Sequence, residues 1–242
     1  MNYPANHEQD FFVSWHETDF QAKMTIKSIS DMLMELAWIH AGELGFGFED
    51  LETQSYLWVL SRLKIDIINY PKWRENIKAK TWPVDIQKLF ANRHFNIKNE
   101  QEEIIINAGS NWLIIDNSSR RPVRPEKVFH ERVVWTNEKA VSEIDKIDVS
   151  ACDEMLYSKK VKYSDLDFNK HVINSKYIEM TMDALSESML MAQTVSSFQI
   201  NFIAEGRMGD ELQLYSNKTN DTFKILRLAD QKEVVHVRID WK

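Results

Sequence analysis

Residues 28–42 read SISDMLMELAWIHAG and predict a helix around which the first half of the chain can be arranged. Ser28 and Asp31 have the spacing of a capping box, and Gly42 and Gly45 offer a stop. Apolar side chains lie on one face of this helix and also fill most of the others, so we expect it to be buried nearly all round. A helix of this kind needs other segments of the chain wrapped around it.

Strands are predicted on both sides of this helix, because apolar and polar residues alternate there with a period of two. The candidates in the first half cover residues 10–17, 63–67, 77–81, 90–98 and 103–116. One strand, a helix and about four further strands are typical of an antiparallel meander. The simplest arrangement is a curled sheet around the single helix.

The same order of elements recurs in the second half. A strand at 157–163 and a helix at 174–191 precede four candidate strands, at residues 197–204, 211–217, 222–228 and 234–241. The repeated pattern indicates a duplicated architecture. The stretch from Pro122 to about Met155 is charged and weakly periodic, which is typical of a linker. We therefore expect a first domain at residues 1–135, a linker at 136–155 and a second domain at 156–242.

The composition is that of an ordinary globular protein. With 242 residues, 43% of them hydrophobic, the chain can bury a sizeable core. No run approaches the ~20 apolar residues of a membrane helix, and the first ten residues lack the apolar run of a signal peptide. The single cysteine, Cys152, can form neither an internal disulfide nor a cysteine-based metal site. We expect a cytoplasmic protein, and the net charge of −7 disfavours nucleic acid as a partner.

The densest group of polar residues is DLDFNKH, residues 165–171, immediately before the second predicted helix. In an extended segment every second side chain would share one face, which would bring together acid, amide and imidazole groups. The free backbone N–H groups at the start of the helix could stabilise an oxyanion. Taken alone, the pattern Asp-x-Asn-x-His is more typical of a turn before a helix, with Asn174 as a plausible N-cap.

A longer stretch, DLDFNKHVINSKYI at residues 165–178, resembles the active-site motif of acyl-acyl carrier protein thioesterases of plants and bacteria. Residues 58–62, 70–73, 81–82 and 120–122 resemble the amino-terminal domain of that family. The resemblance implies an α+β fold of two tandem hotdog domains, each an antiparallel sheet wrapped around a long central helix. It also implies hydrolysis of the thioester of a fatty acyl chain to release free fatty acid.

By motif position, the resemblance implies a catalytic set of Asp167, Asn169, His171 and Glu205. Plant members carry a cysteine where Gly206 stands, so we expect attack by water, or direct attack by a carboxylate, instead of a thiol nucleophile. We assign Glu205 as the base, Asn169 as the group that positions water or substrate, His171 as a polarising or proton-transferring group, and Asp167 as its orienter.

Two features of this assignment stay open. His171, with Asp167 behind it, could itself be the base, which would leave Glu205 to hold the water or to attack directly. A backbone N–H near Val172 or Ile173 is expected to meet the oxyanion.

The first half lacks this set of side chains. Lys23 stands opposite His171, and Tyr70 stands opposite Glu205, so we expect no catalysis there. The first domain is the better candidate for lining an acyl-chain pocket. The residues predicted to bind the acyl chain are Met32, Met34, Trp38 and Trp58. His40, on the same helix, is expected to be a core histidine with satisfied hydrogen bonds.

The resemblance implies acyl carrier protein, bearing a fatty acyl chain, as the partner. Two basic groups are candidates for docking it: Arg120, Arg121 and Arg124, and Lys159, Lys160 and Lys162. We expect no cofactor, no metal, no nucleic acid and no membrane, and we leave a homodimer open. Three rival functions remain: an acyl-coenzyme A thioesterase, a thioester hydratase or dehydratase, and, less favoured, a non-catalytic acyl-binding module.

Overall fold

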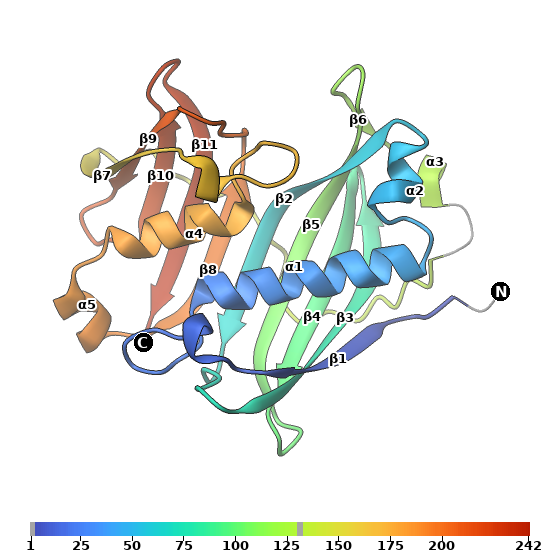
Figure 1. The fold of residues 1–242 in the computed structure, drawn as a ribbon, viewed down its shortest axis with the longest axis horizontal. Helices are drawn as coiled ribbons and strands as arrows, with labels where there is room; N and C mark the ends of the chain where they lie inside the picture. The colour runs from blue at the N-terminus through green and yellow to red at the C-terminus, as the bar shows by residue number, and fades with distance from the viewer. Residues whose placement is uncertain (1–2, 130–132) are drawn as a thin grey trace. The chain divides into compact units, whose positions relative to one another are not determined.

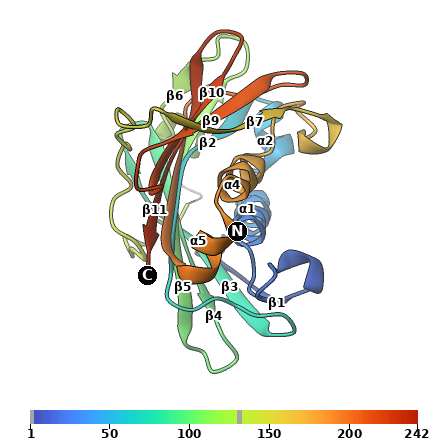
Figure 2. The ribbon, with the colours of Figure 1, turned by 90° about the vertical axis from the view of Figure 1, so that its left-hand side faces the viewer.

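The computed structural model describes residues 3–129 and 133–242 and divides into two compact units, Met1–Ile144 and Asp145–Lys242 (Figure 1). Each unit is an antiparallel sheet with a helix on one face, as Figure 2 shows in a second view. The boundary between the units falls inside the segment 136–155 that was expected to be a linker. Residues 130–132, which belong to the expected first domain, lie outside the described residues.

The first unit begins with a strand and a long helix, and four long strands follow. The long elements are β1 (His7–Phe12), α1 (Ile26–Glu43), β2 (Tyr56–Ile67), β3 (Asn76–Gln87), β4 (Phe90–Lys98) and β5 (Ile104–Asp116). Shorter elements are a 3₁₀ turn at Trp15–Glu17, α2 (Phe48–Glu52), β6 (Pro122–Val123) and α3 (Glu126–Phe129). The strand order is β1-β3-β4-β5-β2, and every pairing is antiparallel. β6 pairs with β5.

Helix α1 is buried on all sides except one stripe, as its sequence predicts. Its exposed positions are Asp31, Glu35, Gly42 and Glu43. The helix begins at Ile26, because the Thr25 hydroxyl accepts the backbone N–H of Ser28 at 3.0 Å. The capping box expected at Ser28 and Asp31 is therefore wrong. The Asp31 carboxylate instead pairs with Lys27 at 2.7 Å, one turn earlier.

The start of the first sheet also differs from the prediction. The strand expected at 10–17 ends at Phe12, and residues 15–17 form the 3₁₀ turn. The backbone N–H of Ser14 donates to the Glu17 carboxylate at 2.7 Å, and this local bond turns the chain away from the strand direction.

The second unit repeats the order of the first. Its elements are β7 (Glu154–Lys160), a 3₁₀ turn at Tyr163–Asp165, α4 (Asn174–Asp183), α5 (Glu187–Ala192), β8 (Val195–Phe202), β9 (Glu211–Ser216), β10 (Thr222–Arg227) and β11 (Lys232–Trp241). The strand order is β8-β11-β10-β9-β7, again antiparallel throughout. α4 carries a buried face that includes Tyr177 and Ile178.

Two predicted boundaries in this unit are wrong. The helix expected at 174–191 is two helices, because Ser186 has an extended backbone and its hydroxyl accepts the N–H of Met189 at 3.3 Å, so that a new helix begins. Strand β7 begins at Glu154, inside the expected linker, and ends at Lys160 before the 3₁₀ turn. In the described part of the chain, no helix is long and apolar enough to span a membrane.

Candidate active site

The segment at residues 165–171 is a turn and not an extended strand. The backbone N–H of Asp167 donates to the carbonyl of His171 at 2.8 Å, and the N–H of Lys170 donates to the carbonyl of Asp167 at 3.0 Å. Lys170 adopts the left-handed backbone conformation, with φ of 63°. The expectation that alternate side chains share one face is therefore wrong, because these backbone bonds close the chain into a loop.

Asp167 fixes the backbone of His171 and not its ring. One carboxylate oxygen of Asp167 accepts the backbone N–H of His171 at 3.0 Å. Asn169 lies exposed at the tip of the turn, and the structure, which describes all of these residues, joins it by no hydrogen bond to His171 or Glu205. The sequence-based site is thus brought together only in part.

Asp165, the first acid of the motif, belongs to a separate buried ion pair. Its carboxylate accepts from Lys159 Nζ at 2.7 Å and from the backbone N–H of Lys162 at 2.9 Å. Burial alone would raise the pKa of Asp165, but the hydrogen bonds from Lys159 and Lys162 outweigh it and the net shift is downward. Lys159 is therefore engaged inside the second unit, whereas Lys160 and Lys162 are exposed.

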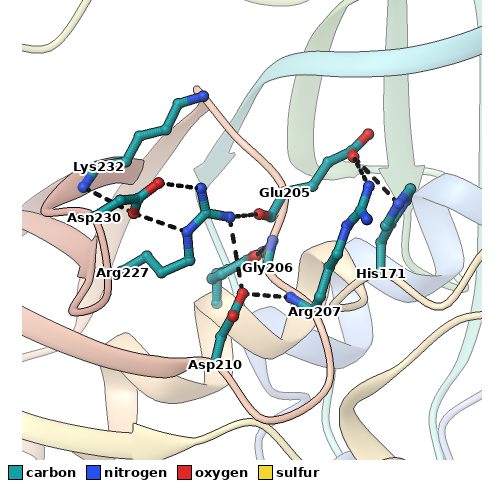
Figure 3. Close-up of polar contacts among 9 residues, drawn as sticks. His171, Glu205, Gly206, Arg207, Asp210, Arg227, Asp230 and Lys232 are labelled. Atoms are coloured by element: carbon teal, nitrogen blue, oxygen red, sulfur yellow. Dashed lines mark hydrogen bonds and ion pairs between the residues drawn. The ribbon is translucent and has the colours of Figure 1, made fainter.

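The imidazole of His171 and the carboxylate of Glu205 meet, as Figure 3 shows. His171 Nε2 lies 3.2 Å from Glu205 Oε2, and both side chains are partly exposed. Arg207 Nη2 lies 3.8 Å from the same oxygen. His171 comes from the turn before α4, and Glu205 comes from the loop after β8, so the fold of the second unit joins two segments that are 34 residues apart.

Two residues that the sequence reasoning missed hold the Glu205 loop in place. Arg227, on β10, donates to the carbonyl of Glu205 at 2.8 Å and is itself held by two hydrogen bonds to Asp230 (Figure 3). The hydroxyl of Tyr177, on α4, accepts the backbone N–H of Gly206 at 2.9 Å. Tyr177 lies in the motif at 165–178, but nothing in the sequence distinguishes Arg227 from other cations.

Gly206 lies where a side chain would collide. A Cβ atom at this position would be 2.8 Å from the Tyr177 hydroxyl and 3.0 Å from a methyl group of Val172. The same close approach lets the Gly206 carbonyl accept the N–H of Val172 at 2.9 Å. The loop that carries Glu205 is therefore packed tightly against the turn that carries His171.

The backbone donors expected near Val172 and Ile173 are already used. The Val172 N–H donates to Gly206, and the Ile173 N–H donates to the carbonyl of Asp165 at 2.9 Å. Ile173 is also the N-cap of α4, so Asn174 is the first helical residue and not the cap that was expected. The N–H groups at the first turn of α4, at Asn174 and Ser175, are the remaining candidates for an oxyanion site.

The first unit contains the same turn without the same chemistry. Asp19 accepts the backbone N–H groups of Gln21 and Lys23, and Ala22 has φ of 59°, close to that of Lys170 in the second unit. Lys23 Nζ donates to Gln21 at 2.7 Å and lies 5.8 Å from the centre of the Tyr70 ring. The repeated backbone geometry is thus filled by a lysine and a tyrosine in place of the imidazole and the carboxylate.

An apolar pocket lies in the first unit. Its lining residues are Ala37, Trp38, Ala41, Leu44, Phe46, Trp58, Pro83, Ala91, Asn92, Arg93, Trp112, Phe129, Val133 and Trp135. Of the residues predicted to bind an acyl chain, Trp38 and Trp58 line the pocket. Met32 is buried elsewhere on α1, and Met34 is half-buried; neither is among the lining residues.

His40 is a core histidine with both ring nitrogens satisfied, as expected. Its Nδ1 accepts from Arg93 at 2.9 Å, and its Nε2 donates to the Pro4 carbonyl at 3.1 Å. Burial, with help from the nearby Arg93 charge, lowers the pKa of His40 to about 4, so the ring is neutral. Among the described residues, no cluster of three or more His, Cys, Asp or Glu is arranged to hold a metal ion.

Comparison with known proteins gives two family models that together match most of the chain. The acyl-ACP thioesterase N-terminal domain matches residues 4–132, and the acyl-ACP thioesterase C-terminal domain matches residues 150–242. An oleoyl-acyl carrier protein thioesterase of Coriandrum sativum is 25% identical over 228 residues, which are 85% of this chain and 60% of that protein. A palmitoyl-acyl carrier protein thioesterase of Arabidopsis thaliana is 26% identical over 259 residues, which are 96% of this chain and 63% of that protein. The chain thus spans less than two thirds of the length of these plant relatives.

Two solved structures share the whole fold. An acyl-ACP thioesterase from Bacteroides thetaiotaomicron superposes with a TM-score of 0.89 at 24% identity, covering 98% of each chain. A 12:0-ACP thioesterase from Umbellularia californica superposes with a TM-score of 0.85 at 18% identity, covering 99% of this chain and 98% of that one. These likenesses confirm the α+β architecture of two hotdog domains in tandem.

Proposed function

The chain belongs to the acyl-ACP thioesterase family, and from this premise we propose that it hydrolyses the thioester of a fatty acyl chain carried by acyl carrier protein and releases the free fatty acid. The observation that carries the proposal is the contact between His171 and Glu205 at 3.2 Å, in the domain that the family's C-terminal model matches. A carboxylate beside an imidazole is a suitable pair for moving the protons of a hydrolysis.

The proposed reaction needs no group beyond the side chains present and a water molecule. Glu205 takes a proton from the water, and the resulting hydroxide oxygen forms a bond to the carbonyl carbon. The carbon–sulfur bond then breaks, and the leaving thiolate takes up the proton that Glu205 removed from the water, either directly or relayed through His171, which restores the carboxylate. A backbone N–H in the first turn of α4 is placed at the positive end of the helix, where a developing oxyanion would be stabilised.

The contacts around Glu205 favour it as the base. Its backbone carbonyl accepts a hydrogen bond from Arg227, and the next residue, Gly206, is hydrogen-bonded to Tyr177. The backbone from which the Glu205 side chain extends is therefore held in place. Asp167 contacts the backbone of His171, and among the described residues no carboxylate other than Glu205 is within 4 Å of the imidazole. His171 therefore lacks a second acid behind its ring, which the alternative role as base would need. We assign Asp167 to holding the turn and Asn169 to contacting the substrate from its exposed position.

The first unit supplies the proposed acyl-chain pocket, with Trp38 and Trp58 among its walls. We propose the exposed Arg121, Arg124 and Lys162 as docking residues for the acidic carrier protein, whereas Lys159 is committed to Asp165. The cytoplasm is the compartment we propose, because the one cysteine is a buried free thiol.

The test is incubation of the protein with a fatty acyl chain on acyl carrier protein, the same chain on coenzyme A, and an enoyl thioester. The proposal expects release of free thiol and fatty acid in equal amounts, fastest from the carrier protein. Change at the double bond without thiol release would identify a hydratase. Faster release from coenzyme A would reassign the carrier, and binding without turnover would leave only an acyl-binding module.

A further inference from the structure

One charged residue, Arg93 on β4, lies among the described lining residues of the mostly apolar pocket. Its Nη1 donates to His40 Nδ1 at 2.9 Å and to the Thr81 hydroxyl at 3.1 Å. A guanidinium carries five N–H donors, and these two bonds use the two on Nη1. Within the residues that the structure describes, the donors on Nε and Nη2 have no acceptor.

Within residues 3–129 and 133–242, no acid compensates this charge. Both partners of Arg93 are neutral, since His40 is an uncharged imidazole and Thr81 an alcohol. The structure pairs Arg93 with no carboxylate among the described residues, and burial lowers the pKa of the guanidinium to about 10. At neutral pH the residue is therefore a cation in an apolar pocket. An isolated charge in such a place is unfavourable unless it meets a partner.

The Nη1 group of Arg93 and its Nε and Nη2 groups differ in their contacts. Through Nη1 it ties α1, which carries His40, to β3, which carries Thr81 (Figure 1).

A purely structural arginine would use its remaining donors on protein acceptors as well. The other polar lining residue, Asn92, does so: its amide donates to Asp85 and accepts from Asn111. The indole N–H groups of Trp58 and Trp112 are likewise satisfied, by the Phe46 carbonyl and the Ser110 hydroxyl. Among the described lining residues, Arg93 is the one charged group that keeps donors without a protein acceptor; the uncharged indole N–H groups of Trp38 and Trp135 have none either.

We propose that this pocket selects acyl chains that carry an oxygen acceptor, such as a hydroxyl, keto or carboxyl oxygen, at the position along the chain that reaches Arg93. This inference rests on the proposed function, because it takes the pocket to hold the acyl chain. A hydrocarbon chain would leave the free donors of Arg93 without partners, whereas an oxygen at that depth would accept one or two charged hydrogen bonds. The apolar walls bind the rest of the chain.

The experiment measures kcat/KM for carrier-linked saturated chains and for chains of equal length that bear one hydroxyl at successive carbons or a terminal carboxyl. The native protein is compared with Arg93→Met and with Arg74→Met, a matched control on an exposed cation of the same unit that stacks on Trp73. For at least one oxygen position, the native preference over the saturated chain is expected to exceed that of Arg93→Met by roughly 10- to 100-fold. Arg74→Met should behave like the native protein.

A binding measurement keeps this inference separate from the hydrolytic function. Quenching of the tryptophans that line the pocket gives dissociation constants for the free oxygenated and saturated acids without turnover. Tighter binding of an oxygenated acid that is lost in Arg93→Met supports the subsite even if no thioester is cleaved. If Arg93→Met does not fold, Arg93→Lys, which keeps the charge and loses the planar fork, should show the same loss in part. Equal preferences in native and variant proteins at every oxygen position would overturn the inference.

Discussion

At the scale of single residues, Gly206 illustrates how closely the site is packed. A Cβ at this position would meet the Tyr177 hydroxyl at 2.8 Å, so Gly206→Ala must displace the group that anchors the loop. We expect Gly206→Ala to destabilise the protein by about 1–3 kcal/mol and to lower turnover at least tenfold. Adding Tyr177→Phe removes the colliding oxygen and should restore part of the stability. Urea unfolding and kcat of the four proteins of this double-mutant cycle check the prediction, and additive losses would contradict it.

The buried histidines of the first unit make its stability depend on pH. Burial lowers the pKa of both His40 and His94 from 6.5 to about 4, and His94 Nδ1 accepts the N–H of Ala140 at 2.8 Å. Between pH 6.5 and about 4 the unfolded chain binds protons that the folded chain refuses, so stability is full above 6.5 and falls as the pH falls. Each histidine should contribute a slope of about 1.4 kcal/mol per pH unit in that window.

Urea unfolding at pH 7, 6, 5 and 4.5 measures this slope. His94→Gln can still accept the Ala140 N–H but does not titrate, so it should flatten the dependence. His16→Gln, at an exposed position, is the control and should leave the slope unchanged. A native protein whose free energy of unfolding is constant over this range would contradict the prediction.

At the scale of elements, helix caps decide where the predictions from sequence succeed. Alternation and helical periodicity predicted the type and order of the long helices and strands, because these patterns reflect which face is buried. They placed the start of α1 three residues late, because Thr25 takes the N–H of Ser28. They also missed the break before α5, because Ser186 starts a second helix within an apolar run. A single side-chain hydrogen bond sets each of these helix starts, and the spacing of apolar residues contains no information about that bond.

The cap of α1 gives a direct test of the corrected boundary. Thr25→Ala removes the oxygen that accepts the Ser28 N–H and should cost about 1 kcal/mol in the free energy of unfolding. Ser28→Ala removes a hydroxyl that shares a hydrogen bond with the Thr25 hydroxyl and should cost less. Thr53→Ala, at an exposed helix end, is a matched control. A larger loss in Ser28→Ala than in Thr25→Ala would show that the helix begins where the sequence pattern placed it.

The sequence predicted which residues form the candidate site where the motif identifies them. It did not predict the positions that depend on the turn between Asp167 and His171. The motif and the later glutamate located His171 and Glu205, which the fold joins at 3.2 Å. The extended reading of the motif misplaced Asp167 and Asn169, because backbone bonds close the chain between Asp167 and His171. Arg227 gave no signal at all, since its role depends on a strand lying beside the Glu205 loop, which only the folded structure reveals.

At the scale of the whole molecule, the two units have the same order of elements and the same turn before the long helix. Only the second unit carries the imidazole and the carboxylate at that turn and the loop beside it. The turn at Asp19–Lys23 reproduces that at Asp167–His171, down to a left-handed residue just before its end. Tyr70 occupies the place of the glutamate, and burial raises its pKa, which keeps it a neutral phenol. We therefore expect one active site per chain, in the second unit.

Docking of the carrier protein is a property of the surface and should respond to salt. Arg121→Glu combined with Arg124→Glu, both exposed on the first unit, should raise KM for a carrier-linked substrate several-fold and weaken its dependence on ionic strength. A short coenzyme A thioester should be affected little. Equal loss on both substrates would indicate damage to the fold or to the chemistry instead of to docking.

The most direct test of the central claim is hydrolysis of a carrier-linked fatty acyl thioester by the native protein, Glu205→Gln and His171→Gln. The matched controls are Glu233→Gln and His236→Gln, which alter another carboxylate–imidazole pair of the second unit, with 2.9 Å between its atoms. We predict that the native protein and both controls release fatty acid and thiol in equal amounts, and that each site variant loses kcat by roughly 10²-fold or more while remaining folded. Full activity in a folded Glu205→Gln, or no release of fatty acid by the native protein, would contradict the claim.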